Sequence, residues 1–121
     1  MSYRVLIRAF TLRRDVSTSY LVKGYLETKN CEVRISSVRE FNFFLKYWQP
    51  HLVIINTVGV IKNVHNINPN CLIVHWPGEG AEDDNTCDAA LLKNNLEAFE
   101  RLDLILAWGK LGKNQFIKTF K

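Results

Sequence analysis

Cysteine is scarce in this sequence and never occurs in a CxxC pair. The three cysteines, Cys31, Cys71 and Cys87, are odd in number and widely spaced. This usage excludes a disulfide-stapled scaffold and predicts reduced, buried thiols in a reducing compartment. Cys71, His75 and Cys87 can be considered as metal ligands, but no fourth ligand has a fitting spacing, so no metal site is predicted.

Long hydrophobic runs are also missing. No apolar stretch approaches the roughly 20 residues that a membrane-spanning helix needs. Residues 1–9 are interrupted by Arg4 and Arg8, which excludes a signal peptide or an anchor at this end. We therefore expect a cytoplasmic location, extending at most to the inner face of the membrane.

The glycines are few and are not arranged for nucleotide chemistry. The loop after the first predicted strand reads Phe10-Thr-Leu-Arg-Arg-Asp15 and contains no glycine. A dinucleotide site needs GxGxxG there so that the backbone can approach the pyrophosphate, so no tightly bound NAD or FAD is expected. A GxSxG nucleophile elbow is absent too, which leaves hydrolase chemistry without support.

Charged side chains are unevenly distributed along the chain. Residues 1–50 carry nine basic and four acidic side chains, residues 51–108 carry three basic and eight acidic ones, and the last thirteen residues add four lysines. A uniformly basic nucleic-acid binder would not show this pattern, so nucleic acid is not an expected partner. The asymmetric field could instead attract an anionic ligand or an acidic membrane surface, as a peripheral contact.

What the sequence does contain is a strand pattern that alternates five times with a helix pattern. Aliphatic and β-branched runs predict the strands, and apolar residues at helical spacing predict the helices. The strands are expected at residues 3–9, 31–36, 51–56, 71–76 and 103–108, and the helices at 14–29, 37–48, 58–66, 89–101 and 109–120.

The clearest helix is 37–48. Val38, Phe41, Leu45 and Trp48 recur along one stripe, which is expected to face the core. A core-facing stripe explains this pattern better than any cofactor site does.

The alternation predicts an α/β fold with right-handed crossovers: a Rossmann-like, doubly wound, five-stranded parallel sheet with helices on both faces. The expected strand order is 3-2-1-4-5. The nearly continuous apolar run 51–56 suits a parallel strand that is covered on both faces. Residues 1–121 are expected to form a single domain that belongs to a longer protein.

In such a sheet, ligands bind beyond the carboxyl ends of the strands. The turn after the fourth strand places Glu79 between Gly78 and Gly80, where its carboxylate could act as a general base or bind sugar hydroxyls. His75, near the same edge, is a second candidate catalytic base. The competing interpretations are a surface loop that needs glycine and a buried strand histidine.

The other strand ends supply candidate substrate-binding residues. Two arginines beside a helix N-terminus could hold a phosphate or a carboxylate, or they could simply be solvent-exposed. The candidate substrate-binding residues are Arg13, Arg14, Asp15, Asn56, Thr57, Gly78, Gly80, Trp108 and Gly109.

The end of the third strand bears on a second function. A receiver domain, the phosphorylated module of two-component signalling, needs an aspartate where this chain has Asn56. It also needs an acidic pair after the first strand, where this chain has Phe10 and Thr11. Phosphoryl acceptance is therefore not expected, although the fold could be shared. A non-catalytic receiver-like or flavodoxin-like module, acting through protein contacts of the aromatic helix 37–48, is the alternative function.

Five short segments occur along nearly the whole chain in a fixed order. They are Arg13-Arg14-Asp15, Cys31-Glu-Val-Arg34, Gln49-Pro-His-Leu-Val-Ile-Ile-Asn56, His75-Trp-Pro-Gly-Glu-Gly80 and Leu102-Asp-Leu-Ile-Leu-Ala-Trp-Gly109. In their order and spacing, these segments resemble the N-terminal half of surface-carbohydrate biosynthesis proteins with the GT-B glycosyltransferase fold.

The resemblance implies the acceptor-side domain of a glycosyltransferase for bacterial capsule or surface polysaccharide. Such a domain would be inactive without a C-terminal GT-B domain of the same chain, which would bind the nucleotide-sugar donor. The implied partner is a glycan or a lipid-linked acceptor, and no tightly bound cofactor is expected in this half. The resemblance implies that five residues line the cleft between the two halves: Arg14, Asp15, Asn56, Glu79 and Gly80.

Overall fold

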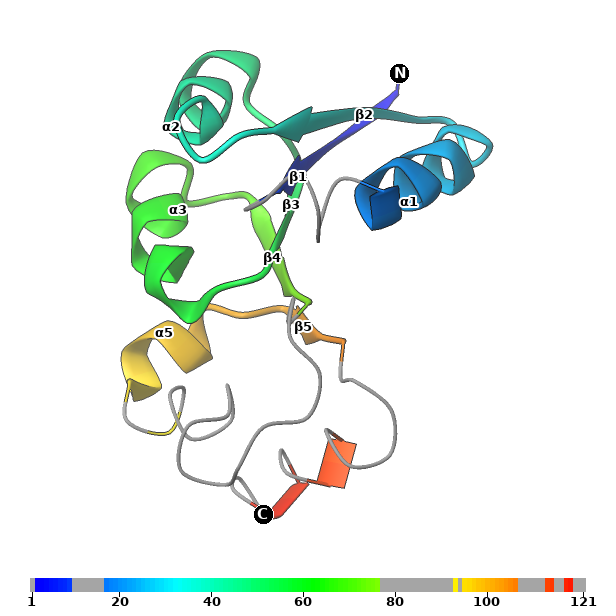
Figure 1. Cartoon of the computed structure of the whole chain (residues 1–121). Coiled ribbons are helices and arrows are strands. Elements are labelled where there is room, and N and C mark those ends of the chain that lie inside the picture. Colours follow the sequence, from blue (N-terminus) through cyan, green and yellow to red (C-terminus); the bar gives the residue numbers. More distant parts are fainter. Residues whose placement is uncertain are drawn as a thin grey trace.

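The computed structural model describes residues 2–9, 17–76, 93, 95–106, 113–114 and 117–118, within which strands alternate with helices (Figure 1). The strands are β1 (Tyr3–Arg8), β2 (Cys31–Ser36), β3 (Leu52–Ile55), β4 (Leu72–His75) and β5 (Leu104–Ile105). The helical segments are α1 (Ser17–Glu27), α2 (Phe41–Phe43), the π-helical turn η2 (Phe44–Trp48), the 3-10 turn η3 (Val58–Val60), α3 (Ile61–Ile67) and α5 (Leu96–Glu100).

The five strands form one parallel sheet in the order β2-β1-β3-β4-β5. Helix α1 covers one face of this sheet, and α2, α3 and α5 lie on the other (Figure 1). The predicted α/β class, with a five-stranded parallel sheet and helices on both faces, is thereby confirmed.

The strand order differs from the predicted 3-2-1-4-5, because β3 lies next to β1 and β2 forms an edge. The side chains of β2 explain its place: Glu32 and Arg34 are exposed, which an edge strand tolerates. In contrast, β3 buries its residues on both faces, and a parallel strand of that kind belongs inside a sheet. The continuous apolar run of β3 therefore indicated an inner strand. The predicted order was wrong because it placed this strand at an edge.

Contacts at the start of β3 hold it beside β1. The N–H of Arg4 donates to Nδ1 of His51 at 2.9 Å, and the N–H of His51 donates to the carbonyl of Arg4 at 2.9 Å. The Arg4 guanidinium also donates from Nε and Nη2 to the carbonyl of Gln49, at 3.1 and 2.9 Å. The ring of Tyr3 stacks on His51 with 4.7 Å between centroids. These contacts fix the register of the β1–β3 pair.

The sheet separates two hydrophobic layers. On the side of α1, the strands bury Val5, Ile7, Val33, Ile54 and Val74 against Val22 and Leu26 of the helix. On the other side, they bury Leu6, Val53, Ile55 and Ile73 against Phe41, Leu45, Ile61, Val64 and Ala98.

The apolar stripe predicted for helix 37–48 is confirmed in part. Phe41 and Leu45 are buried in the core, and Trp48 packs partly buried against it. Val38 is exposed, contrary to the prediction, because residues 38–40 form a turn and α2 begins only at Phe41.

The last described strand is short but firmly attached. The N–H of Asp103 donates to the carbonyl of Ile73 at 2.9 Å, and the N–H of Ile73 donates to Oδ2 of Asp103 at 2.8 Å. The carboxylate thus takes the place of a strand carbonyl at the start of β5. The predicted strand 103–108 is described as far as residue 106, and only Leu104–Ile105 has strand geometry.

Candidate binding site at the carboxyl edge of the sheet

The carboxyl ends of the strands lie along one edge of the sheet because all five strands are parallel. The chain passes from β1 to α1 on one face and from β3 to α3 on the other (Figure 1). The connections after these neighbouring strands therefore diverge, and in open α/β sheets ligands bind where they do so. We call this edge, which includes Arg8, Ser36, Asn56 and His75, the carboxyl edge.

Asn56 and Thr57 directly follow β3 and are half-buried at the carboxyl edge. Thr57 has an extended backbone, with φ −143° and ψ 140°, and precedes η3. Oδ1 of Asn56 is shielded from solvent. The strand therefore ends in an amide rather than a carboxylate, and a neutral amide lacks the anionic oxygen that would attack a phosphoryl donor.

His75 closes β4 and has no exposed surface. Its register neighbours are Ile55 in β3 and Ile105 in β5. A general base has to come within hydrogen-bond reach of its substrate, whereas these surroundings are those of a core side chain. A catalytic role for His75 stays a prediction. Its burial favours the competing interpretation, in which His75 is a buried strand histidine.

The remaining predicted site residues lie outside the described residues. They are Arg13, Arg14, Asp15, Gly78, Glu79, Gly80, Trp108 and Gly109. Of the predicted site, the structure therefore describes the parts at the ends of β3 and β4 only. The roles of the other residues stay predictions.

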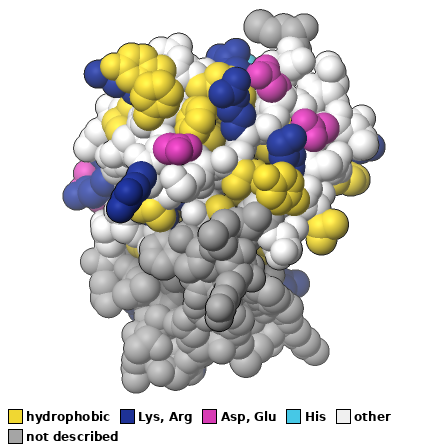
Figure 2. All heavy atoms as spheres, turned by 45° about the horizontal axis from the view of Figure 1, so that its top comes forward, with side chains coloured by type: hydrophobic (Ala, Val, Ile, Leu, Met, Phe, Trp, Pro, Cys, Tyr) yellow, Lys and Arg dark blue, Asp and Glu magenta, His cyan; other side chains and the backbone are white. Residues whose placement is uncertain are grey.

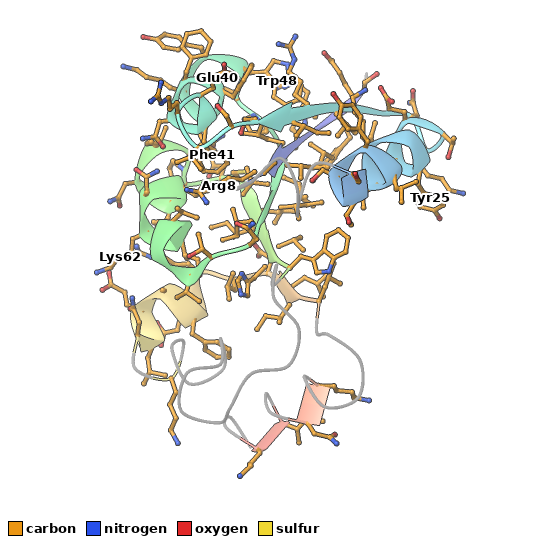
Figure 3. All side chains as sticks on the ribbon, in the orientation of Figure 1. Arg8, Tyr25, Glu40, Phe41, Trp48 and Lys62 are labelled. Carbon is orange, nitrogen blue, oxygen red and sulfur yellow. The ribbon has the colours of Figure 1, made fainter. Side chains whose placement is uncertain are left out.

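Two buried polar side chains at the carboxyl edge were not among the predicted site residues. Arg8 ends β1 and is 9% exposed, and its register neighbour Ser36 at the end of β2 is 1% exposed. Nε and Nη1 of Arg8 and Oγ of Ser36 are shielded from solvent and have no hydrogen-bond partner among the described residues. The guanidinium carbon of Arg8 lies 5.5 Å from the centre of the Phe41 ring, between β1 and α2 (Figure 3). Burial lowers the pKa of Arg8 from its ordinary value, although an arginine remains charged in proteins.

The alternation along β1 was the available signal for Arg8. Leu6 and Arg8 are two residues apart and therefore lie on the same face of the sheet. Leu6 is fully buried in the layer that includes Phe41. In an inner strand, a charge two positions after a buried leucine points into the protein, but β1 can be recognised as an inner strand only once the strand order is known.

A second candidate surface lies on η2 and at the end of α2. Phe43 and Tyr47 are 59% and 66% exposed, with 4.9 Å between their ring centroids. Nζ of Lys46 lies 5.4 Å from the centre of the Tyr47 ring. The guanidinium carbon of Arg34 lies 5.0 Å from the centre of the Trp48 ring. Hydrophobic and basic side chains lie side by side on the face that carries α2 (Figure 2). We call these five residues the aromatic surface.

The thiol of Cys71 is buried just before β4. Burial, with the nearby Asp103 carboxylate as a smaller cause, raises the pKa of Cys71 to about 12. Because the thiolate is the reactive form, iodoacetamide at about pH 8 should leave Cys71 unmodified in the folded chain and modify it in guanidinium chloride. Peptide mass spectrometry measures both reactions, and equal rates in the two conditions would contradict the burial of this thiol.

The part of the chain that the structure describes has neither a cluster of metal ligands nor a membrane-spanning helix. No group of three or more His, Cys, Asp or Glu side chains there is placed to hold a metal ion. Cys87, one of the three ligands considered from the sequence, lies outside that part. None of the described helices has the length and apolar character that crossing a bilayer requires.

Comparison with known proteins gives a likeness in fold and none in sequence. No protein-family model matches the chain, and no curated protein is similar to it. Among solved structures, the chain is similar to a response regulator from Burkholderia pseudomallei, described with a phosphorylated aspartic acid, a calcium ion and citrate. The TM-score is 0.67 at 11% sequence identity, over 99% of this chain and 67% of that one. At this identity the likeness concerns the fold alone.

The predicted resemblance to a glycosyltransferase domain is wrong. The solved structure described above is a response regulator rather than a glycosyltransferase, and the observed order β2-β1-β3-β4-β5 is the flavodoxin-like one. Of the segments behind the resemblance, the described ones, such as Cys31–Arg34 and Gln49–Asn56, lie at strands of the parallel sheet, which many α/β domains share. The expected donor, acceptor and second domain rested on that resemblance and are not carried further.

Proposed function

We propose that this chain is a non-catalytic, receiver-like binding module that takes up no phosphoryl group at β3 and acts through protein contacts of its aromatic surface. The observation that carries the proposal is Asn56, which follows β3 where a receiver needs its acceptor aspartate. The likeness in fold to a response regulator supports the comparison of these two positions.

The charge at the end of β1 points the same way. A receiver needs acidic side chains after its first strand, where this chain has Phe10 and Thr11, and the last residue of β1 is the buried Arg8. A cation in this place repels the divalent ion that carboxylates would attract. The ends of β1 and β3 are therefore unsuited to phosphoryl transfer.

The aromatic surface has the composition of a protein interface. Aromatic and arginine side chains are enriched at the centres of such interfaces, and Phe43 and Tyr47 are exposed together as an adjacent pair. The turn η2, which carries Tyr47, is π-helical, a rare conformation that is frequently found at functional sites. With Lys46 and Arg34 beside the rings, the surface suits an acidic partner that offers an apolar contact.

Acetyl phosphate with Mg²⁺ is expected to leave this chain unmodified, because Asn56 offers no carboxylate. Intact-mass spectrometry of the treated protein measures the outcome, and the Burkholderia pseudomallei response regulator serves as the positive control. A mass gain of one phosphoryl group that maps to an aspartate of the folded chain would end the non-phosphorylated interpretation.

Site-specific photo-crosslinking tests the aromatic surface separately. A benzoyl-phenylalanine placed at position 43 should give a discrete adduct with an acidic protein in cells that express this chain. The adduct should weaken when Lys46→Glu reverses the neighbouring charge. The matched control carries the same probe at Tyr25, which is similarly exposed but lies on α1, on the other face of the sheet. Identical adducts from both positions, or an adduct insensitive to the charge reversal, would count against the surface.

A further inference from the structure

We infer that Arg8 and Ser36 form an anion-binding site at the carboxyl edge, and that its ligand is a small oxyanion of the phosphate type. The inference goes beyond the proposed function, because the site lies inside the protein and would bind its ligand whether or not the aromatic surface has a partner.

The first step is the unbalanced charge of Arg8. The residue is 9% exposed, and the Nε and Nη1 atoms of its guanidinium are shielded from solvent with no hydrogen-bond partner in the part of the chain that the structure describes. Among the described residues the ion pairs join Lys23 to Glu27, and Lys62 and Arg101 to Glu97. None of these described pairs involves Arg8. Removing a charge from water is costly unless a counter-charge and hydrogen bonds replace the lost hydration.

The second step separates an anion from water as the missing partner. Water could accept the N–H groups of Arg8, but it would leave the positive charge in place. The Phe41 ring, 5.5 Å from the guanidinium carbon, offsets part of that charge through a cation–π contact. An oxyanion both neutralises the charge and accepts from the N–H groups, and charge-assisted hydrogen bonds of this kind are the stronger ones.

The third step is the position of Ser36. It pairs in register with Arg8 on the neighbouring strand, so the two side chains emerge on the same face of the sheet about 5 Å apart at their backbones. Its hydroxyl is shielded from solvent and has no hydrogen-bond partner within the described ranges, which leaves an O–H donor on the same face of the sheet as Arg8. Two buried residues with unsatisfied donors thus lie next to each other in register, on the same face of two neighbouring strands.

The location and the burial narrow the ligand. Arg8 ends β1 at the divergence between β1 and β3, where open α/β sheets bind ligands. Arg8 and Ser36 are only 9% and 1% exposed, so a bulky group attached to the anion would not fit without displacing core residues such as Phe41. Inorganic phosphate is therefore the appropriate probe.

Isothermal titration calorimetry of the full chain with sodium phosphate tests the site. We expect binding by the wild-type protein and a rise of Tm with phosphate that exceeds the rise in sodium chloride of equal ionic strength. Arg8→Met, which keeps the length of the side chain, should weaken phosphate binding by at least about tenfold. Ser36→Ala should weaken it less, and Arg39→Met, which removes an exposed arginine, should leave it unchanged.

Three outcomes would overturn the site. Stabilisation that phosphate and chloride share equally would leave water as the partner of Arg8. Equal binding by the wild-type protein and the Arg8→Met variant would place the phosphate elsewhere, and binding of acetate in preference to phosphate would contradict the assigned ligand class. If Arg8→Met does not fold, the wild-type titration and Ser36→Ala decide the question.

Discussion

Phe41→Ala is expected to lower the free energy of unfolding by about 3–5 kcal/mol. The ring is 2% exposed and packs in the layer between the sheet and α3, so its removal leaves a cavity that the neighbours fill only in part. Arg8 also loses the aromatic face above its guanidinium, a contact that contributes about 0.5–2 kcal/mol. Because the total free energy of unfolding of a domain of this kind is about 5–15 kcal/mol, the variant should be close to unfolding.

Phe43→Ala is the matched control for this variant. Phe43 lies two residues later in the same helix and is 59% exposed, so its removal should change the free energy of unfolding by no more than about 0.5 kcal/mol. Urea unfolding followed by far-ultraviolet circular dichroism measures both variants. Similar losses in the two would mean that α2 packs through a different face.

Leu6→Ala is expected to lower the free energy of unfolding by about 2–5 kcal/mol, the second largest effect. Leu6 is fully buried in β1, with Arg34 and Val53 as its register neighbours in β2 and β3. No exposed surface lets the site collapse toward solvent, and the side chain belongs to the same core layer as Phe41. The variant therefore tests the place of β1 inside the sheet.

The control for Leu6→Ala is Leu72→Ala in β4. Leu72 is 41% exposed, so the same chemical change should cost at most about 1 kcal/mol. The same urea titration compares the two variants. A loss for Leu72→Ala as large as that for Leu6→Ala would contradict the division of the strands into buried and exposed positions.

The strands were predictable because their patterns are local. The run 51–56 and the alternating segment 31–36 each have a composition that favours a strand whatever lies beside it. The strand order was not predicted correctly, because it depends on contacts between residues far apart in the sequence, such as those of Arg4 with His51 and Gln49. The side chains of β2 and β3 nevertheless distinguish an edge strand from an inner one, and weighing them would have favoured the observed order.

The candidate site was predictable to a smaller degree. Asn56 was placed correctly at the end of β3, because the apolar run before it has a clear end. Arg8 was seen only as an interruption of a hydrophobic N-terminus, since its burial follows from the strands on either side of β1 and not from its own sequence neighbours. Ser36 lies at a strand end, where ligands are expected, but its residue type did not single it out, because a serine at a strand end is ordinary.

The glycosyltransferase resemblance shows the limit of short motifs. Segments such as Gln49–Asn56 describe the entry and exit of a buried parallel strand, which physical constraints make similar in many α/β domains. The order in which strands lie side by side separates these folds more sharply, and no single motif encodes it.

The helical turn below the aromatic surface closes through an N–H of Gln49 that donates to the carbonyl of Phe44, five residues earlier, at 3.1 Å. An α-helix closes its turns over four residues, so this turn holds one residue more than a regular helix would. Deleting one residue here would rotate the side chains beyond the deletion by about 100° about the helix axis. When homologous chains are aligned, a one-residue gap within 44–46 would accordingly mark those in which the side chains after the gap, including the one at position 47, are turned relative to Phe43.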